Sequence, residues 1–175
     1  MTQRIQIPVE QFQTQIFHLF ANALLLTSGE FKEKKFNTMT ISWGSMGRIW
    51  ERPFVQVVVR PHRYTYQFTE QYDSFTLSAF PEKYYDTLMM LGTKSGRDSD
   101  KIKESGLTPI PSHHIGSPGF EEAELIIECK KIYYQDINPK MFLANYIAPM
   151  YNNDYHRSYF GEILGIWGVE KYLVK

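Results

Sequence analysis

The chain has 175 residues with 19 basic and 19 acidic side chains, so its formal net charge is zero. This length predicts a single domain over residues 1–175, and the zero net charge excludes bulk attraction to nucleic acid or to an anionic membrane. The single cysteine, Cys129, excludes an intramolecular disulfide. Without a signal-like or ~20-residue apolar stretch, we expect a cytoplasmic protein.

Six stretches carry the β-branched or alternating apolar pattern of strands. They are residues 23–27, 36–43, 54–60, 75–80, 124–134 and 160–167. Helical signals mark four further stretches, which are residues 63–71, 81–91, 98–104 and 138–146. Residues 106–120, rich in Pro, Gly and Ser, are expected to form a long loop. Short strands with scattered helices predict a mainly β fold, a closed or half-open antiparallel β-barrel with a few flanking short helices.

The stretch NTMTISWG, residues 37–44, alternates hydroxyl and apolar side chains. Residues two apart point to the same face of a strand. Ile41 and Trp43 are therefore expected to pack inward together, and the opposite face carries a row of hydroxyls from Thr38, Thr40 and Ser42. This row has two interpretations: a wet exterior of the barrel, or a wall that faces a polar, flat ligand.

The stretch RPHRYTY, residues 60–66, places two arginines where a strand ends and a helix is expected to begin. A helix start exposes free N–H groups and a partial positive charge. Together with Arg60, Arg63 and the hydroxyl of Thr65, it would form a phosphate cradle. A strand end with solvated arginines is the alternative. A second basic stretch, SGRDSDK at residues 95–101, fits either an anion site or a flexible charged loop.

Several familiar motifs are absent or incomplete in the sequence. The pair Lys94-Ser95 lacks the preceding glycine of a P-loop, and the glycines at 161, 165 and 168 lack the spacing of a dinucleotide-binding fingerprint. One cysteine and five scattered histidines give poor support for a metal site, so we expect none. Cys129 lies on an apolar face of its expected strand, which indicates a buried structural thiol rather than a nucleophile.

The order of these motifs resembles that of one protein family. NTMTISWG, RPHRYTY, FTLSAF, GTKSGRDSDK, Gly106-Leu107-Thr108 and EEAELIIECK follow one another as in the flavin reductase-like proteins with the FMN-binding split-barrel fold. The flavoredoxin branch of that family is the most similar. The resemblance runs from about Ala23 to Ile166, and it implies an FMN cofactor and a homodimer with the flavin near the subunit interface.

The resemblance also implies which residues bind the cofactor. Those expected to line the isoalloxazine ring are Asn37, Thr38, Met39, Thr40 and Ser42. Those expected to hold the ribityl phosphate are Arg63, Tyr64 and Thr65, with Arg60 as a helper. Those expected to close over the phosphate end are Ser95, Gly96 and Lys101. Ser78, on the strand FTLSAF, is a further match to the family.

Related reductases carry an Asp-His pair before a strand that reads like Phe-x-Gly-Glu-Val-Leu, and the His lies near the nicotinamide. Here DYHRSYFGEIL, residues 154–164, keeps the spacing from His156 to Gly161, but Tyr155 separates His156 from Asp154. The resemblance therefore nominates His156 as a catalytic residue. A surface histidine in a loop rich in Tyr and Asn is the alternative.

These inferences predict a flavin oxidoreductase that takes hydride from NAD(P)H onto bound FMN and passes electrons to an unidentified acceptor. FMN would supply the redox chemistry, which agrees with the lack of an obvious catalytic triad. Two alternatives remain open. One is a flavoredoxin-type electron carrier that does not itself oxidise NAD(P)H, and the other is a split-barrel module that binds a different planar or phosphorylated ligand.

Overall fold

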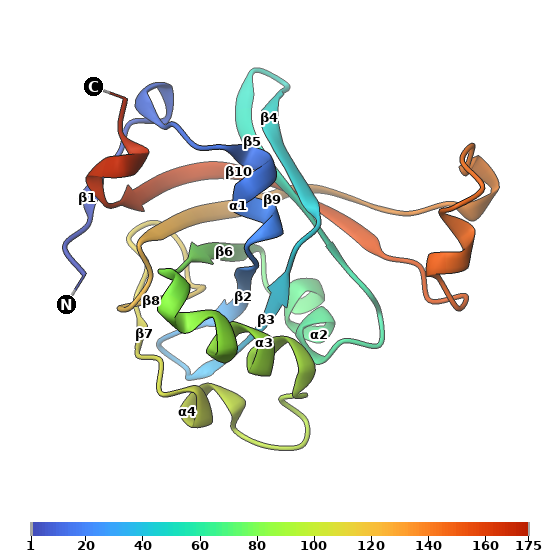
Figure 1. Ribbon diagram of the computed structural model, residues 1–175, viewed down its shortest axis with the longest axis horizontal. Helices are drawn as coiled ribbons and strands as arrows, with labels where there is room; N and C mark the ends of the chain where they lie inside the picture. The colour runs from blue at the N-terminus through green and yellow to red at the C-terminus, as the bar shows by residue number, and fades with distance from the viewer. Residues whose placement is uncertain (1, 175) are drawn as a thin grey trace.

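An antiparallel sheet of eight strands organises the fold (Figure 1), and the computed structural model describes residues 2–174. The strands of this sheet are β1 (Ile5–Gln6), β2 (Leu24–Glu30), β3 (Lys35–Ile41), β4 (Gly44–Ile49), β5 (Arg52–Val59), β6 (Ser74–Ala79), β9 (Leu125–Asp136) and β10 (Arg157–Gly168). A separate pair consists of β7 (Pro109–Ile110) and β8 (Gly119–Phe120). The helices are α1 (Ile16–Ala21), α2 (Tyr64–Gln71), α3 (Tyr85–Thr93) and α4 (Lys101–Ser105).

The order of the strands explains why the barrel is split. Neighbouring strands follow the order β3-β2-β6-β9-β10-β5-β4, and β1 pairs with β10. β3 and β4 are therefore the outermost strands of the sheet, yet the two residues Ser42 and Trp43 join them directly along the chain. The sheet curls until its two edges approach each other at this link. This arrangement confirms the predicted half-open antiparallel barrel with short flanking helices.

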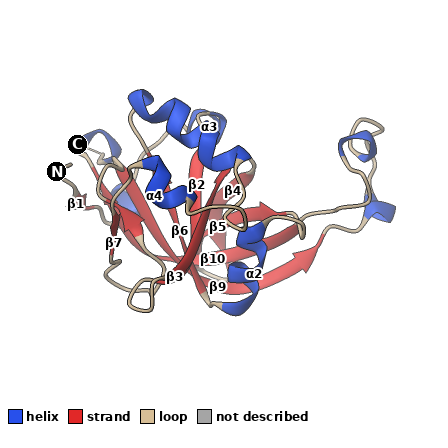
Figure 2. Cartoon of the chain, turned by 90° about the horizontal axis from the view of Figure 1, so that it is seen from below, coloured by secondary structure: helices blue, strands red, loops and turns tan. Residues whose placement is uncertain are grey.

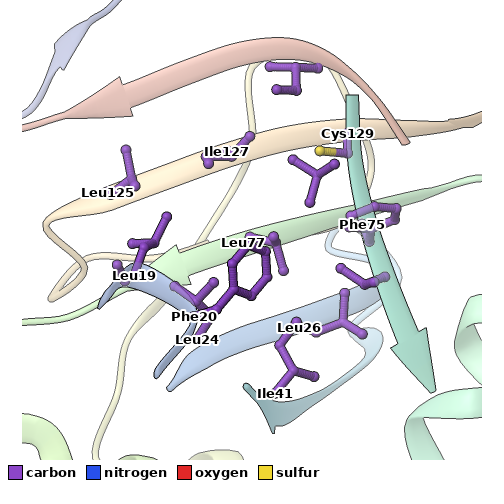
Figure 3. Packing of buried hydrophobic residues seen from close by; sticks show 14 of the residues in the cluster. Leu19, Phe20, Leu24, Leu26, Ile41, Phe75, Leu77, Leu125, Ile127 and Cys129 are labelled. Atoms are coloured by element: carbon purple, nitrogen blue, oxygen red, sulfur yellow. The ribbon is translucent and has the colours of Figure 1, made fainter. Parts of the chain in front are cut away.

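Apolar side chains fill both faces of the curled sheet. Leu24 and Leu26 of β2 belong to the main cluster inside the barrel, and Leu25 between them belongs to a second cluster with residues of α3. Figure 3 shows Leu24 and Leu26 in the main cluster, which also contains Phe75 and Cys129. Cys129 is completely buried there, which confirms the prediction of a buried thiol.

All six predicted strands form, but the hairpin partner of β5 was not predicted. β4 contains Gly44 and Gly47, which resemble turn residues in the sequence, and β5 pairs with it across a tight turn. Trp50 and Glu51 form that turn with positive φ angles of 49° and 61°. β2 also runs further than predicted, to Glu30, because the charged turn that follows is short.

The helices agree less well with the predictions. α1 was not predicted, and α3 continues past its expected end through Gly92, where a Cβ atom would lie 3.1 Å from Thr40. The helix predicted over residues 138–146 is wrong, because a single 3₁₀ turn, Pro139–Met141, forms at its start. Short helices in water depend on packing against a core, and this segment has no sheet face to cover. Among residues 2–174, no helix is long and apolar enough to cross a membrane.

Residues 137–156, between β9 and β10, extend away from the barrel and are called the projecting segment below (Figure 2). This segment carries several exposed apolar side chains. Leu143 is fully exposed, and Met141 and Tyr146 are 72% and 71% exposed.

Candidate functional site

The start of α2 forms the first part of the site. Pro61 follows β5, and a turn in which the Arg63 N–H donates to Arg60 O at 3.0 Å leads into the helix. Arg63 is the N-cap residue with an extended backbone, and no side chain caps the helix. The first N–H groups of α2 therefore stay available to an anion, and the helix dipole adds a partial positive charge.

Asn37 and Gly96 close around this helix start. Asn37, in β3, donates from Nδ2 to Thr65 Oγ1 at 2.7 Å, and both side chains are buried. Gly96 lies so close that a Cβ atom there would be 2.5 Å from Asn37 Oδ1 and 2.9 Å from Tyr64 Cδ1. A glycine is therefore needed where β3, α2 and the loop before α4 meet.

Two cations, Arg63 and Lys101, are held beside the end of α3. Arg63 Nη2 donates to Gly92 O at 2.8 Å, and Lys101 Nζ donates to Leu91 O at 2.8 Å and to Lys94 O at 3.0 Å. Lys101 is 2% exposed, and burial together with the nearby Arg63 lowers its pKa to about 8. Burial also lowers the pKa of Arg63. Two desolvated cations that repel each other favour a bound anion.

We call this assembly the cradle; its residues are Asn37, Arg63, Tyr64, Thr65, Gly96 and Lys101. Arg97 lies at its outer edge, where Nη1 donates to His62 O at 3.0 Å and the guanidinium carbon lies 5.0 Å from the centre of the Tyr64 ring. Ser95 Oγ accepts a hydrogen bond from the Arg97 N–H at 3.2 Å, so Ser95 shapes this loop.

A cleft of 360 Å³ lies beside the cradle, at the split of the barrel. Its walls combine flat or apolar side chains, hydroxyls and basic groups. The lining residues are Met39, Thr40, Ile41, Ser42, Trp43, Val58, Arg60, His62, Arg63 and His156. Arg63 belongs to both the cradle and the cleft, so a ligand anchored through an anionic end in the cradle can extend a flat end into the cleft.

The hydroxyl row of NTMTISWG divides between the interior and the cleft. Thr38 is completely buried, and its Oγ1 donates to Leu26 O at 3.0 Å. Thr40 Oγ1 donates to Leu88 O at 2.5 Å, and Thr40 lines the cleft together with Ser42. A wet exterior is therefore the wrong description of Thr38 and Thr40, whereas Ser42 is exposed. Thr38 lies behind the cleft wall rather than in it.

The side chain of Trp43 does not pack into the barrel with the other apolar residues of NTMTISWG. Met39 and Ile41 are both 6% exposed and belong to the main core cluster, as their alternation predicts. Trp43 is 43% exposed and lies with its ring 5.3 Å from that of His156. The inward packing expected for Trp43 is wrong because β3 ends at Ile41, and the alternation of faces ends with it.

His156 is a buried wall residue of the cleft, 9% exposed, so the surface-loop interpretation is wrong. Its Nδ1 lies 3.0 Å from the hydroxyl of Tyr151. Burial and the nearby Arg60 lower the pKa of His156 to about 4, so the ring is neutral at neutral pH. A neutral ring whose Nδ1 accepts from Tyr151 carries its proton on Nε2. The catalytic role of His156 stays a prediction.

Asp154, the aspartate of the expected Asp-His pair, contacts a different histidine. Its Oδ2 forms a hydrogen bond with Nδ1 of His62, which lies in the stretch before α2. Arg60 Nη2 donates to Met150 O at 3.0 Å, and the Arg60 guanidinium carbon lies 5.1 Å from the centre of the Tyr151 ring. These contacts attach Met150 and Asp154 of the projecting segment to Arg60 and His62 of the cleft. The projecting segment therefore forms part of the wall of the cleft.

Two side chains considered above lie away from the cradle and the cleft. Ser78, on β6, is completely buried, and its Oγ has no hydrogen-bond partner within residues 2–174. The structure does not bring Ser78 to the site. Burial and the neighbouring Glu128 raise the pKa of the Cys129 thiol, which is therefore unreactive. Within the described chain, no group of three or more His, Cys, Asp or Glu side chains could hold a metal ion.

Sequence reasoning missed three contributors to the site. Trp43 was assigned to the core, and His62 was quoted as part of RPHRYTY without a role. A basic stretch that bounds a helix start was the available signal for His62. Tyr151 gave no such signal, because its position depends on how the projecting segment returns to the barrel.

A split barrel with an anion cradle beside a flat-walled cleft defines a class of protein that binds a ligand with one anionic and one planar end. The model of the flavin reductase like domain matches residues 17–171, which include the cradle, the cleft and the projecting segment. The chain belongs to the flavin reductase-like family, as the motif order predicted.

The chain is also similar to individual proteins and solved structures. An uncharacterised protein of Pyrococcus abyssi is 28% identical over 132 residues, which cover 74% of this chain and 73% of that protein. The structure of flavoredoxin from Desulfovibrio vulgaris (Miyazaki F) has a TM-score of 0.67 and 25% identity, covering 85% of this chain and 70% of that one. The structure of an FMN-binding domain of a flavin reductase-like enzyme from Shewanella baltica has a TM-score of 0.69 and 16% identity. The match covers 95% of this chain and 78% of that one.

Proposed function

We propose that this protein is an FMN-dependent oxidoreductase that takes hydride from NAD(P)H and passes electrons to an acceptor. Membership of the flavin reductase-like family supports a bound flavin and oxidoreductase chemistry. The observation that carries the proposal is the junction at Arg63, where an anion site meets a flat-walled cleft. FMN has these two parts, a phosphate and a planar ring system. The cytoplasm remains the expected compartment, given the lone reduced Cys129.

The cradle has donors left for the FMN phosphate. Arg63 makes one hydrogen bond, to Gly92 O, and a guanidinium has five N–H donors. Lys101 makes two, to Leu91 O and Lys94 O, and an ammonium has three. Gly96 and the start of α2 add backbone N–H groups, and a bare backbone allows a phosphate to approach closely. These residues fit the phosphate in charge and in donor number.

When bound, FMN supplies the hydride and electron transfer, so the protein needs no nucleophile of its own. The chain's residues bind the cofactor, orient it and exclude water. Trp43 offers an exposed flat face at the mouth of the cleft. Because the pKa of His156 is about 4, its ring can exchange hydrogen bonds beside an incoming nicotinamide without adding positive charge.

The similarity to flavoredoxin favours a second candidate function, an electron carrier that binds FMN in the same way but does not oxidise NAD(P)H. The visible absorption spectrum of the purified protein, recorded without oxygen before and after NADH or NADPH is added, tests both. We expect a flavin spectrum that bleaches with one of the two nucleotides. A flavin spectrum that neither nucleotide bleaches supports the carrier. A colourless protein that fails to bind added FMN contradicts both and supports a split-barrel module for another ligand.

We also propose a homodimer in which the projecting segment contacts the second copy. The support is its apolar exposure: Leu143 is fully exposed, and it lies in the same segment that carries the cleft residue His156. Leu143→Glu is expected to yield monomers in sedimentation velocity, whereas Val174→Glu, which changes an exposed apolar residue elsewhere, is expected to leave the dimer intact. A wild-type protein that sediments as a monomer contradicts the proposal.

A further inference from the structure

A second cavity continues from the cradle on the side away from the barrel split. It has a volume of 620 Å³, within the ~300–1,000 Å³ of ordinary small-molecule sites. α2, the turn before β3 and the loop 96–102 form its walls, and we call it the groove. Four cradle residues also line it: Asn37, Tyr64, Gly96 and Lys101. A ligand whose phosphate lies in the cradle could therefore extend directly into the groove.

Aromatic side chains form one wall of the groove. Tyr64, Phe68 and Tyr72 follow one another at intervals of four residues along α2, so they share one face of the helix. Their ring centres lie 5.2 Å and 6.3 Å apart, and all three rings are half-buried. The Tyr64 and Phe68 rings meet edge to face at 86°, whereas the Phe68 and Tyr72 rings are nearly parallel at 14°. Phe68 and Tyr72 are therefore the partly exposed rings on which a planar base can stack.

The charge of the groove is positive in a protein whose formal net charge is zero. Its lining contains four cationic side chains, Lys34, Lys35, Arg97 and Lys101, and two acidic ones, Asp98 and Asp100. Lys35 Nζ also lies 3.2 Å from Glu33 Oε2, in an exposed ion pair. Asp100 already accepts a hydrogen bond from the Lys103 N–H as the N-cap of α4. Arg97 lies over the Tyr64 ring, where the groove leaves the cradle. Cations beside flat rings are complementary to a ligand that joins a base to a phosphate.

We propose that the groove binds a purine nucleotide moiety, whose base stacks on the α2 rings and whose phosphate lies among Lys34, Lys35 and Arg97. The inference rests on the proposed function, because it takes a flavin phosphate in the cradle as the starting point. Two ligands carry this chemistry. One is FAD, whose adenylate half would extend the flavin past the cradle, and the other is NADPH, whose adenosine end bears an additional 2′-phosphate.

Two binding ratios test the proposal and separate the two sources. Dissociation constants of the flavin-free protein for FMN and FAD are measured by quenching of flavin fluorescence. Those of the FMN-loaded protein are measured by calorimetry for NAD⁺ and NADP⁺, which carry the same adenosine ends as NADH and NADPH but cannot pass hydride to the flavin. If the adenylate of FAD occupies the groove, FAD binds at least tenfold more tightly than FMN. If the adenosine end of NADPH occupies it, the two flavins bind equally and NADP⁺ binds at least tenfold more tightly than NAD⁺.

The double variant Tyr72→Ala/Lys35→Glu removes one ring and reverses one charge in the groove without touching the cradle. It is expected to abolish the tenfold preference and to leave the dissociation constant for FMN unchanged. The matched control, Tyr85→Ala/Lys83→Glu on the far side of α3, is expected to keep the preference. Ratios near one in the wild type, or a preference that survives in the groove variant, overturn the proposal. Failure of the wild type to bind FMN overturns the proposed function instead, and binding of 5′-AMP or 2′,5′-ADP to the flavin-free protein then decides the groove alone.

Discussion

The cradle and the cleft adjoin at Arg63 but are built in different ways. The cradle is assembled from the ends of regular elements, namely β3, the start of α2 and the end of α3, and buried hydrogen bonds hold its side chains. The cleft is lined at the split of the barrel, and its outer wall is completed by contacts from the projecting segment. The comparison indicates that the cradle is held by contacts among regular elements and that the cleft is the part whose shape depends on a distant segment.

Removing Arg63, the cation shared by the cradle and the cleft, tests how much the cradle contributes to FMN affinity. Arg63→Ala is expected to weaken FMN binding about a hundred-fold, since a charge-assisted contact contributes roughly 1.5–3 kcal/mol. Titration of flavin fluorescence measures the change. Arg48→Ala, which removes an exposed arginine of β4, is the matched control and is expected to bind FMN normally. Equal affinity in the two variants would falsify the assignment of the cradle.

In the cleft, His156 is expected to make the free energy of unfolding depend on pH. Its pKa of about 4 lies below the ordinary 6.5, so between these values the unfolded chain binds more protons than the folded one. Stability is therefore expected to fall as the pH drops from 6.5 to 4, by up to about 3 kcal/mol. His156→Asn removes this contribution. Urea unfolding across this pH range measures the slope, and the exposed His18→Asn serves as control; a slope that is the same in both variants contradicts the buried, neutral ring.

Packing at the centre of the cradle gives the next largest effect. Gly96→Ala places a Cβ atom 2.5 Å from Asn37 Oδ1, so neighbours must shift, at a cost of about 1–2 kcal/mol in unfolding free energy and with weaker FMN binding. Thermal unfolding and flavin titration report the two effects. Gly47→Ala, where the nearest atom is 3.3 Å away in the β4–β5 hairpin, should change neither by much. A Gly96→Ala protein with wild-type stability and affinity would show that the cradle is not rigid.

The smallest expected effect is a pH dependence of FMN affinity that distinguishes binding of the phosphate from binding of the ring system. Lys101 has a pKa of about 8, so it loses its proton as the pH rises through that value. An FMN phosphate, with its second pKa near ~6, is already fully charged there. FMN affinity is therefore expected to decline several-fold across this step, whereas affinity for riboflavin, which lacks the phosphate, stays constant. A parallel decline for both ligands would place the effect outside the cradle.

The sequence predicted the cradle better than the cleft, for a physical reason. Arg63 and Thr65 sit at a helix start, and the glycine at 96 sits in a loop that leads to another helix, so local chemistry together with the family motif order placed them. The positions of Trp43 and His156 depend on where β3 ends and on how the projecting segment folds back. Propensity within a short window carries no information on either. The missed strand β4 and the wrong helix at 138–146 have the same origin, since long-range packing decided both.

The link between β3 and β4 has a consequence for the size of molecule that can enter the cleft. Ser42 and Trp43 join the two edges of the sheet, so Ile41 and Gly44 can lie no further apart than roughly 11 Å. Each residue added to the link would raise this limit by up to roughly 3.5 Å. Link length is therefore a variable that limits the width of the cleft independently of which side chains line it. Insertion at this link is expected to widen the cleft more than substitution around His156 does.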